Sequence, residues 1–390
     1  MAAIPMVTRN GHRGFWALLA VLGVVLAAAL GAAQYMEHNG HVVTGMNNQV
    51  VWGMPHVFAF FLIVAASGAL NVASIASVFG EKAYKPLAPL SVLLTIALLA
   101  GGLMVLVLDL GRPERLVISA THYNFSSIFA WNMILYTGLF AIGALYLWVL
   151  LERRFGRFAG IVGTAAFAWR VTLTSGTGLI LGFLVARQAY GSAVVAPLFI
   201  ALSLAWGLAA FCLAQAALEF GRGGSIDEAL ARRMGRLLGF FVIVVLWLTA
   251  VYHAANLYWA RQDAFERFIL LDGAPYAALF WGGFVLLGSL VPLALVYHPR
   301  LVGPRSTLVA SALVIAGGFA FVYVFIIGAQ VFPLEIFPGH EVSSSFSDGI
   351  VDPYAPSLAE VLLGLGGVAM AAVITAIGAR VLPILPARQP

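Results

Sequence analysis

The chain has 390 residues, of which 62% are hydrophobic and only 9% charged. Soluble domains are about 45–50% apolar and about 25% charged, so this composition excludes a water-soluble enzyme, a disordered chain and a disulfide scaffold. It also argues against a nucleic-acid partner, although the net charge is +5. A membrane-spanning helix needs about 20 apolar residues, so the sequence predicts an all-α polytopic protein embedded in a lipid bilayer.

About ten apolar stretches are long enough to cross roughly 30 Å of hydrocarbon. In chain order the predicted spans are 16–36, 55–79, 87–108, 126–151, 161–186, 193–218, 236–260, 276–297, 306–328 and 357–382. Glycines lie inside several spans, where small residues let helices pack closely. We interpret nearly all of them as packing positions, among them Gly102, Gly178, Gly207 and Gly318.

Ten spans would place both termini on one side of the membrane. Most of the 21 Lys and Arg residues would lie on that side: Arg9, Arg13, Lys82, Lys85, Arg153, Arg154, Arg157, Arg222, Arg232, Arg233, Arg236, Arg300, Arg305, Arg380 and Arg388. Cytoplasmic loops carry such an excess, so we expect both termini in the cytoplasm and a location in a bacterial inner (cytoplasmic) membrane. A cleaved signal peptide is the alternative for the first span, but its apolar run is longer than the usual 7–15 residues.

Polar side chains in spans are costly, and several are predicted near the non-cytoplasmic face. They are His56, Asp109, Arg112, Tyr123 and Asn132. A quinone needs a hydrogen-bond partner at each of its two oxygens and protons when it is reduced. Histidine exchanges protons near neutral pH, and a carboxyl group in an apolar site can carry a proton. Structural alternatives remain open: Asp109 and Arg112 could pair within a helix-ending turn, and Asn132 could bond to a neighbouring helix.

Three further ionisable residues are candidates for a proton path. Arg170 is predicted near the bilayer centre, where a charge requires water, a partner or backbone carbonyls. We favour a hydrated cavity open to the cytoplasmic side. His253 lies in the seventh span, and Glu360 begins the tenth. Haem ligation by His56 and His253 is a weaker alternative, because nothing else in the sequence supports that pair.

The single cysteine, Cys212, limits the redox chemistry of the chain itself. Iron–sulfur clusters usually take four cysteines, and the sequence has neither a covalent haem motif nor cysteines at metal-ligand spacing. We therefore expect no haem, no cluster and no metal site in this chain. Any redox metal would belong to a partner.

Two other functions compete with quinone chemistry. A secondary transporter of small anions would use similar polar groups, but near the bilayer midplane. A passive membrane anchor would need no ligand site at all.

Several segments together resemble the NrfD/PsrC family of quinone-interacting membrane subunits. Residues 109–113 read Asp-Leu-Gly-Arg-Pro directly after a span, and residues 52–56 read Trp-Gly-Met-Pro-His before another. Residues 123–127, 177–182 and 354–360 add to this similarity. Within the family, residues 354–360 resemble the last helix of the ten-span, HybB-like branch, and the segment 35–52 resembles the DsrP-type subunits of sulfite-reduction-associated complexes.

The resemblance implies two four-helix bundles, formed by spans two to five and six to nine, with one flanking helix at each end. The corresponding parts of the chain are 1–54, 55–151 with the quinone site, 152–192, 193–328 and 329–390. The resemblance also implies a periplasmic ferredoxin-like iron–sulfur subunit as partner, for which the acidic 329–356 loop would offer docking surface. A c-type cytochrome and other membrane or cytoplasmic redox subunits are further candidate partners.

Our sequence-based hypothesis assigns a role to each candidate residue. Menaquinone or ubiquinone would exchange two electrons with the clusters of the partner subunit. His56 and a group near Tyr123 or Asn132 would hold the two oxygens, Asp109 would transfer a proton, and Arg112 would fix the charge and orientation of Asp109. Arg170, His253 and Glu360 would belong to a proton path. The chain would be non-catalytic alone but part of a quinone oxidoreductase.

Overall fold

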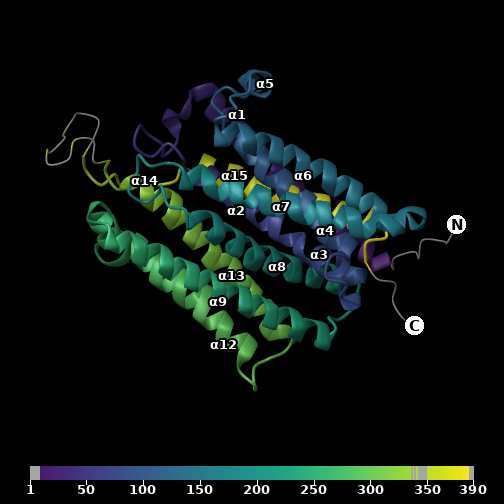
Figure 1. The fold of residues 1–390 in the computed structure, drawn as a ribbon. Helices are drawn as coiled ribbons and strands as arrows, with labels where there is room; N and C mark the ends of the chain where they lie inside the picture. Colours follow the sequence, from purple (N-terminus) through teal and green to yellow (C-terminus); the bar gives the residue numbers. More distant parts are fainter. Residues whose placement is uncertain (1–8, 335–336, 338–339, 341–348, 386–390) are drawn as a thin grey trace.

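The computed structural model describes residues 9–334, 337, 340 and 349–385, and it contains helices but no strand within these ranges (Figure 1). The long helical segments are α1 (Arg9–Asn39), α2 (Met54–Ala69), α3 (Asn71–Ser77), α4 (Ala88–Leu108), α6 (Ile128–Leu151), α7 (Ala159–Gly182), α8 (Val195–Gly221), α9 (Glu228–Tyr258), η7 (Leu279–Leu290) with α12 (Val291–Tyr297), α13 (Pro304–Tyr323) with η8 (Val324–Gly328) and α14 (Ala329–Val331), and α15 (Leu358–Val381). Short helices connect them: η1 (His41–Val43), η2 (Lys82–Leu87), η3 (Pro113–Arg115), α5 (Leu116–Thr121), η4 (Arg153–Phe158), η5 (Ala260–Gln262), α10 (Asp263–Arg267), η6 (Phe268–Asp272) and α11 (Tyr276–Ala278).

The all-α polytopic fold predicted from the sequence is confirmed. Nine helices in the described part of the chain are long and apolar enough to cross a membrane. The predicted fifth span, 161–186, coincides with α7 but is not among the nine. Its sequence includes Arg170 and several threonines, which lower its hydropathy. Because α7 packs against α6 and α8, Arg170, Thr174 and Thr177 are buried by protein.

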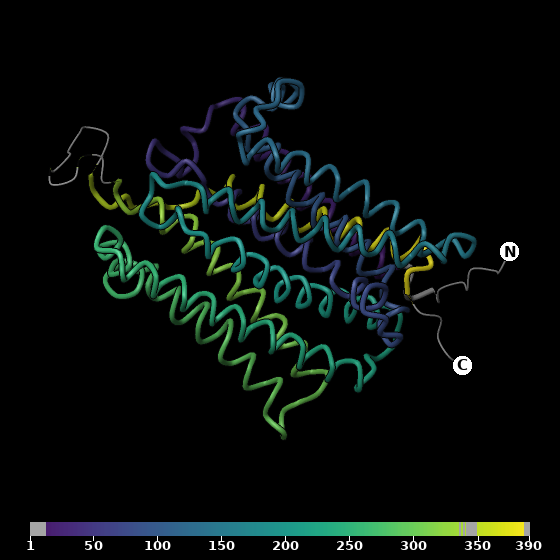
Figure 2. The backbone as a smooth tube through the Cα atoms, in the orientation of Figure 1, coloured from purple at the N-terminus to yellow at the C-terminus, as the bar shows by residue number. Residues whose placement is uncertain are grey.

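The helices form two neighbouring groups, seen as the blue and the green parts of the tube in Figure 2. In the first bundle, α2 with α3, α4, α6 and α7 pack in sequence. In the second bundle, α8, α9, α12 with η7, and α13 do the same. One hydrophobic core includes buried residues of both bundles, so they pack as a single unit.

Glycines bring the two bundles into direct backbone contact. A Cβ atom on Gly68 of α2 would overlap with the backbone of Ser203 on α8, and a Cβ on Gly207 would overlap with the backbone of Gly68. This close approach agrees with the packing role inferred for Gly207.

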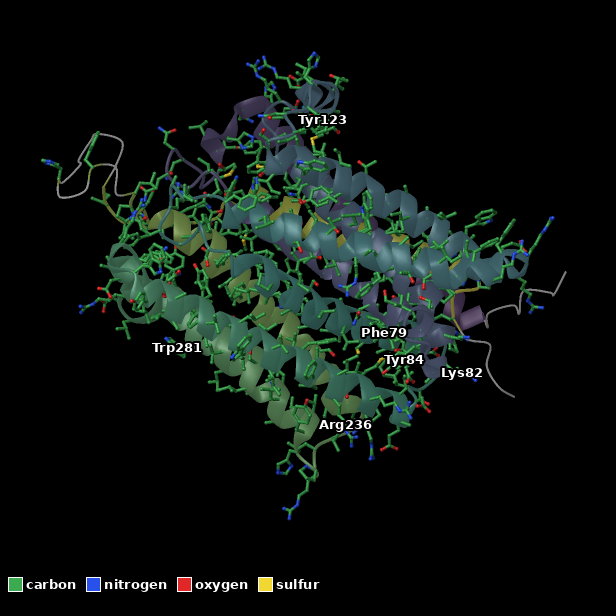
Figure 3. All side chains as sticks on the ribbon, in the orientation of Figure 1. Phe79, Lys82, Tyr84, Tyr123, Arg236 and Trp281 are labelled. Carbon is green, nitrogen blue, oxygen red and sulfur yellow. The ribbon has the colours of Figure 1, made fainter. Side chains whose placement is uncertain are left out.

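The first and last long helices pack against each other outside the first bundle. The Arg380 guanidinium, near the end of α15, lies 4.8 Å from the ring centre of Phe15, near the start of α1. The two helices therefore run antiparallel. Figure 3 places Lys82, which precedes α4, at the opposite end of the molecule from Tyr123, which follows it.

Candidate functional site

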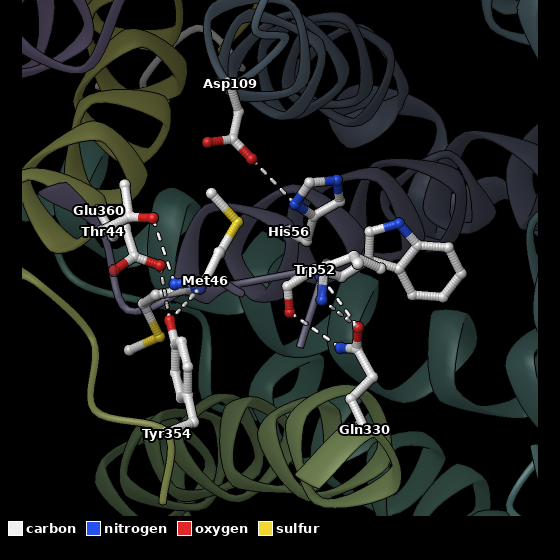
Figure 4. Close-up of polar contacts among 10 residues, drawn as sticks. Thr44, Met46, Trp52, His56, Asp109, Gln330, Tyr354 and Glu360 are labelled. Atoms are coloured by element: carbon white, nitrogen blue, oxygen red, sulfur yellow. Dashed lines mark hydrogen bonds and ion pairs between the residues drawn. The ribbon is translucent and has the colours of Figure 1, made fainter. Parts of the chain in front are cut away.

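His56 and Asp109 meet at the end of the first bundle that the sequence assigns to the non-cytoplasmic face. Pro55 lies in the first turn of α2 beside His56, a position that suits proline because its missing N–H is not needed there. Asp109 is the C-cap of α4, which runs antiparallel to α2. The His56 Nδ1 atom lies 2.9 Å from Oδ2 of Asp109 (Figure 4). The sequence placed both residues at this face but did not pair them.

The Asp109 carboxylate is buried without the donors that such a group normally has. Its side chain is 1% exposed, whereas that of His56 is 20% exposed. Neither Asp109 oxygen has a hydrogen bond to any residue that the structure describes, and the contact with His56 has the distance of an ion pair without the alignment of a hydrogen bond. Buried polar groups without partners are rare and often mark functional positions.

A cavity of about 420 Å³ opens beside this pair, within the range usual for small-molecule sites. We call it the His56 cavity. It is lined by His41, Val42, Met46, Asn47, Asn48, Val51, His56 and Asp109. One wall is thus the segment between α1 and α2, and the other is formed by the ends of α2 and α4. The Trp52 ring stacks on the His56 imidazole with 6.3 Å between ring centres.

The loop formed by residues 44–53 is held in place by groups from distant parts of the chain. The Gln330 side-chain amide accepts from the N–H groups of Val51 and Trp52 at 3.0 and 2.9 Å, and it donates to the carbonyl of Trp52 at 2.9 Å. Arg187 donates to the carbonyls of Gln330 at 3.1 Å and Gln49 at 2.5 Å. Burial lowers the pKa of Arg187. These bonds tie the wall of the His56 cavity to the second bundle.

Glu360 is the other anchor of this loop. Its carboxylate accepts from the Gly45 N–H at 2.8 Å and the Tyr354 hydroxyl at 2.7 Å, and it completes a capping box with Ser357 at the start of α15. The Tyr354 hydroxyl in turn accepts from Met54 N–H. Burial and the bond to Glu360 raise the pKa of Tyr354, so the hydroxyl remains a donor. These contacts give Glu360 a clear structural role.

The other residues assigned to the quinone site lie outside the lining of the His56 cavity. Arg112 is exposed, and no ion pair joins it to Asp109 in the described structure. Tyr123 lies in the loop before α6 and stacks on Phe125. Asn132 is buried between α6 and α7, where its amide donates to the carbonyls of Ile128 and Gly176.

Arg170 lies in a polar layer inside the first bundle. Its guanidinium donates to Asn71 at 3.2 Å and sits 4.8 Å from the ring centre of Phe167. Its carbonyl accepts from Ser67 and Thr174. No acid contacts it among the described residues, as the sequence suggested.

The hydrated cavity expected at Arg170 stays a prediction, because Arg170 lines neither of the two cavities described. A second cavity of about 370 Å³ is lined by Ala76, Ser77, Gly80, Lys85, Ala88, Val149, Leu150, Gly156, Ala159 and Gly160. It opens at the end of the molecule assigned to the cytoplasm, and Arg170 is not part of its wall.

His253 has a carboxylate partner that the sequence did not reveal. Its Nδ1 lies 2.6 Å from Glu266 on α10, and Asn256 donates to the same carboxylate at 2.7 Å. Glu266 is fully buried. It was missed because it belongs to a segment predicted as a loop outside the membrane; its apolar neighbours Phe265 and Ile269 were the available signal. Both histidines considered for haem therefore contact carboxylates.

Comparisons with known proteins show which proteins the chain is similar to. A family model described as "Polysulphide reductase, NrfD" matches residues 42–334. The chain is 29% identical to the Hdr-like menaquinol oxidoreductase integral membrane subunit of Archaeoglobus fulgidus, over 96% of this chain and 94% of that protein. It is 29% identical to a putative dimethyl sulfoxide reductase membrane protein of Halobacterium salinarum, over 94% and 91%. It is 21% identical to a selenate reductase subunit of Mesobacillus selenatarsenatis, over 88% of each.

Proposed function

Because this chain belongs to the NrfD family of polysulphide reductase membrane proteins, we propose that it is the quinone-interacting integral membrane subunit of a respiratory electron-transfer complex. The names of its relatives, which are subunits of a menaquinol oxidoreductase and of reductases, support this proposal. In the complex, this chain binds and orients the quinone and exchanges protons with it, and partner subunits supply the redox metals. Among the described residues, no cluster of His, Cys, Asp and Glu could hold a metal ion.

The observation that carries the proposal is the contact between His56 and the buried Asp109 beside a cavity. Because Nδ1 of His56 lies 2.9 Å from Asp109, we assign the Nε2 atom to the ligand oxygen. When a quinol is oxidised, Nε2 accepts a hydroxyl proton, and the Asp109 carboxylate stabilises the imidazolium that forms. The same groups return the proton when a quinone is reduced. The two electrons pass to redox centres of a partner subunit.

The partner subunit, the orientation in the membrane and the metabolic role of the chain are also proposals. The partner that we propose is a periplasmic iron–sulfur subunit docked at the His56 end, with both termini of this chain in the cytoplasm. Much of the acidic stretch of the 329–356 loop lies outside the described residues. A role in sulfur metabolism and the DsrP-type branch rest on the segment 35–52.

We propose that proton movement linked to turnover involves buried polar groups inside the two bundles. Arg170 with Asn71 forms the polar layer of the first bundle, and His253 with Glu266 forms a pair in the second. Glu360 is better explained as the anchor of the 44–53 loop, because its carboxylate already accepts from a backbone N–H and a tyrosine hydroxyl.

The test is purification of the assembled complex from its native membrane, followed by quinone extraction and fluorescence titration with a hydroxyquinoline N-oxide, a quinol analogue. We expect redox-metal subunits, bound quinone and saturable binding that added quinol displaces. A passive anchor would bind neither. A transporter would instead take up a small anion in liposomes containing this subunit alone.

A further inference from the structure

The His56 cavity contains a second imidazole, that of His41, which has no role in the site as described so far. His41 begins η1, directly after α1, and it lines the same cavity as His56 and Asp109. Its Nδ1 atom is buried and has no hydrogen-bond partner within the described parts of the chain. A Cβ atom on Gly111 would lie 3.5 Å from the His41 ring, which places this imidazole beside the turn that follows Asp109.

We propose that His41 binds the second oxygen of the quinone whose first oxygen is bound by His56. This inference rests on the proposed function. A quinone head group has two oxygens on opposite sides of its ring, so the pair of His56 and Asp109 accounts for one of them only. A second partner must come from elsewhere in the cavity wall.

The other polar residues of the cavity wall are less suitable. The Asn47 side-chain oxygen accepts from the N–H groups of Gln49 and Val50, and its nitrogen donates to Asp352. Asn48 is exposed. The His41 imidazole lines the cavity, and its ring has a nitrogen without a hydrogen-bond partner among the described residues, so we assign the second oxygen to His41.

A histidine at this position also balances the protons of the reaction. Oxidation of a quinol breaks two O–H bonds and releases two protons and two electrons. One proton goes to His56 and the other to His41, while the electrons pass one at a time to redox centres of the partner subunit. In quinone reduction the same two imidazoles supply the protons.

The experiment compares His41→Ala and His41→Gln with His38→Ala in the assembled complex. His38 is exposed on the last turn of α1 and does not line the cavity, so it is a matched control. Binding is measured by fluorescence titration with the hydroxyquinoline N-oxide, and turnover by quinol-dependent reduction of the partner. Subunit ratio and elution volume monitor assembly.

We expect His41→Ala to raise the Kd of the probe and the KM for quinol by roughly tenfold, as the loss of one hydrogen bond to the ligand implies. His41→Gln should restore most of the binding, because an amide still donates, but it should lower kcat because it cannot take a proton. Unchanged Kd and KM in His41→Ala, with binding lost in His56→Ala, would overturn the role of His41 and leave the proposed function intact. Unchanged binding in both variants would overturn the quinone site itself.

Discussion

The Nδ1 atom of His253 lies 2.6 Å from the Glu266 carboxylate, so the second bundle has a histidine–carboxylate pair of its own. It differs from the pair of His56 and Asp109 in two ways. Glu266 also accepts from Asn256, and neither His253 nor Glu266 lines the His56 cavity. A pair whose carboxylate has two partners and that lines neither of the two cavities described fits proton storage or structural support better than ligand binding.

Replacing Glu266 by Gln should therefore lower the stability of the complex and leave quinone binding unchanged. The change keeps the shape of the side chain but removes the acceptor from Asn256 or His253, and we expect a loss of about 1–3 kcal/mol in unfolding free energy. The Kd for the hydroxyquinoline N-oxide should stay at the wild-type value. Thermal unfolding of the detergent-solubilised complex, followed by fluorescence, measures the first effect and titration the second. A large rise in Kd would mean that the two pairs are coupled.

For the pair of His56 and Asp109, we predict an effect on turnover. Asp109→Asn keeps the size of the side chain but removes the charge that stabilises protonated His56, so kcat should fall by roughly 10²–10⁴. Glu114→Gln is the matched control, since it makes the same acid-to-amide change at an exposed position nearby. Quinol-dependent reduction of the partner across the pH range gives the measurement. Wild-type rates at every pH would remove Asp109 from proton transfer.

His56→Ala should act on binding as well as on rate. The substitution removes the imidazole that contacts Asp109 and stacks on Trp52, leaving the buried carboxylate without that neighbour. We expect the Kd of the quinol analogue to rise at least about tenfold and kcat to fall. Titration and turnover of the same purified complex check both. Intact assembly with unchanged kinetics would place the quinone elsewhere.

Gln330 should control the shape of the His56 cavity from the second bundle. Gln330→Ala removes three hydrogen bonds to the backbone of residues 51 and 52, so the loop loses its fixed position. We expect KM for quinol to rise several-fold while kcat changes little, because no reacting atom is lost. Gln34→Ala, at an exposed position on α1, is the control. A fall in kcat at constant KM would contradict a positioning role.

The sequence predicted the helices, and it placed His56 and Asp109 at the same end of the molecule, because hydropathy and the Asp-Leu-Gly-Arg-Pro turn are local signals. It could not predict side-chain partners. Spacing suggested that Asp109 pairs with Arg112, but helix packing brings it to His56 instead. Gln330 and Trp52 are remote in the chain, and no local pattern links them. The division of the chain into parts stays a prediction, since one core runs through both bundles.

The contact between Gly68 and Gly207 gives a test of the packing itself. Gly207→Ala would press a methyl group into the backbone of α2, and a backbone cannot move aside as a side chain can. We expect a loss of about 1–3 kcal/mol in stability, seen as a lower Tm of the complex. The control is Gly282→Ala in η7, where a Cβ would meet nothing within 4 Å. This substitution should leave Tm unchanged or raise it, because alanine favours helices over glycine by about 1 kcal/mol. Equal Tm changes in the two variants would show that the bundles do not meet at this crossing.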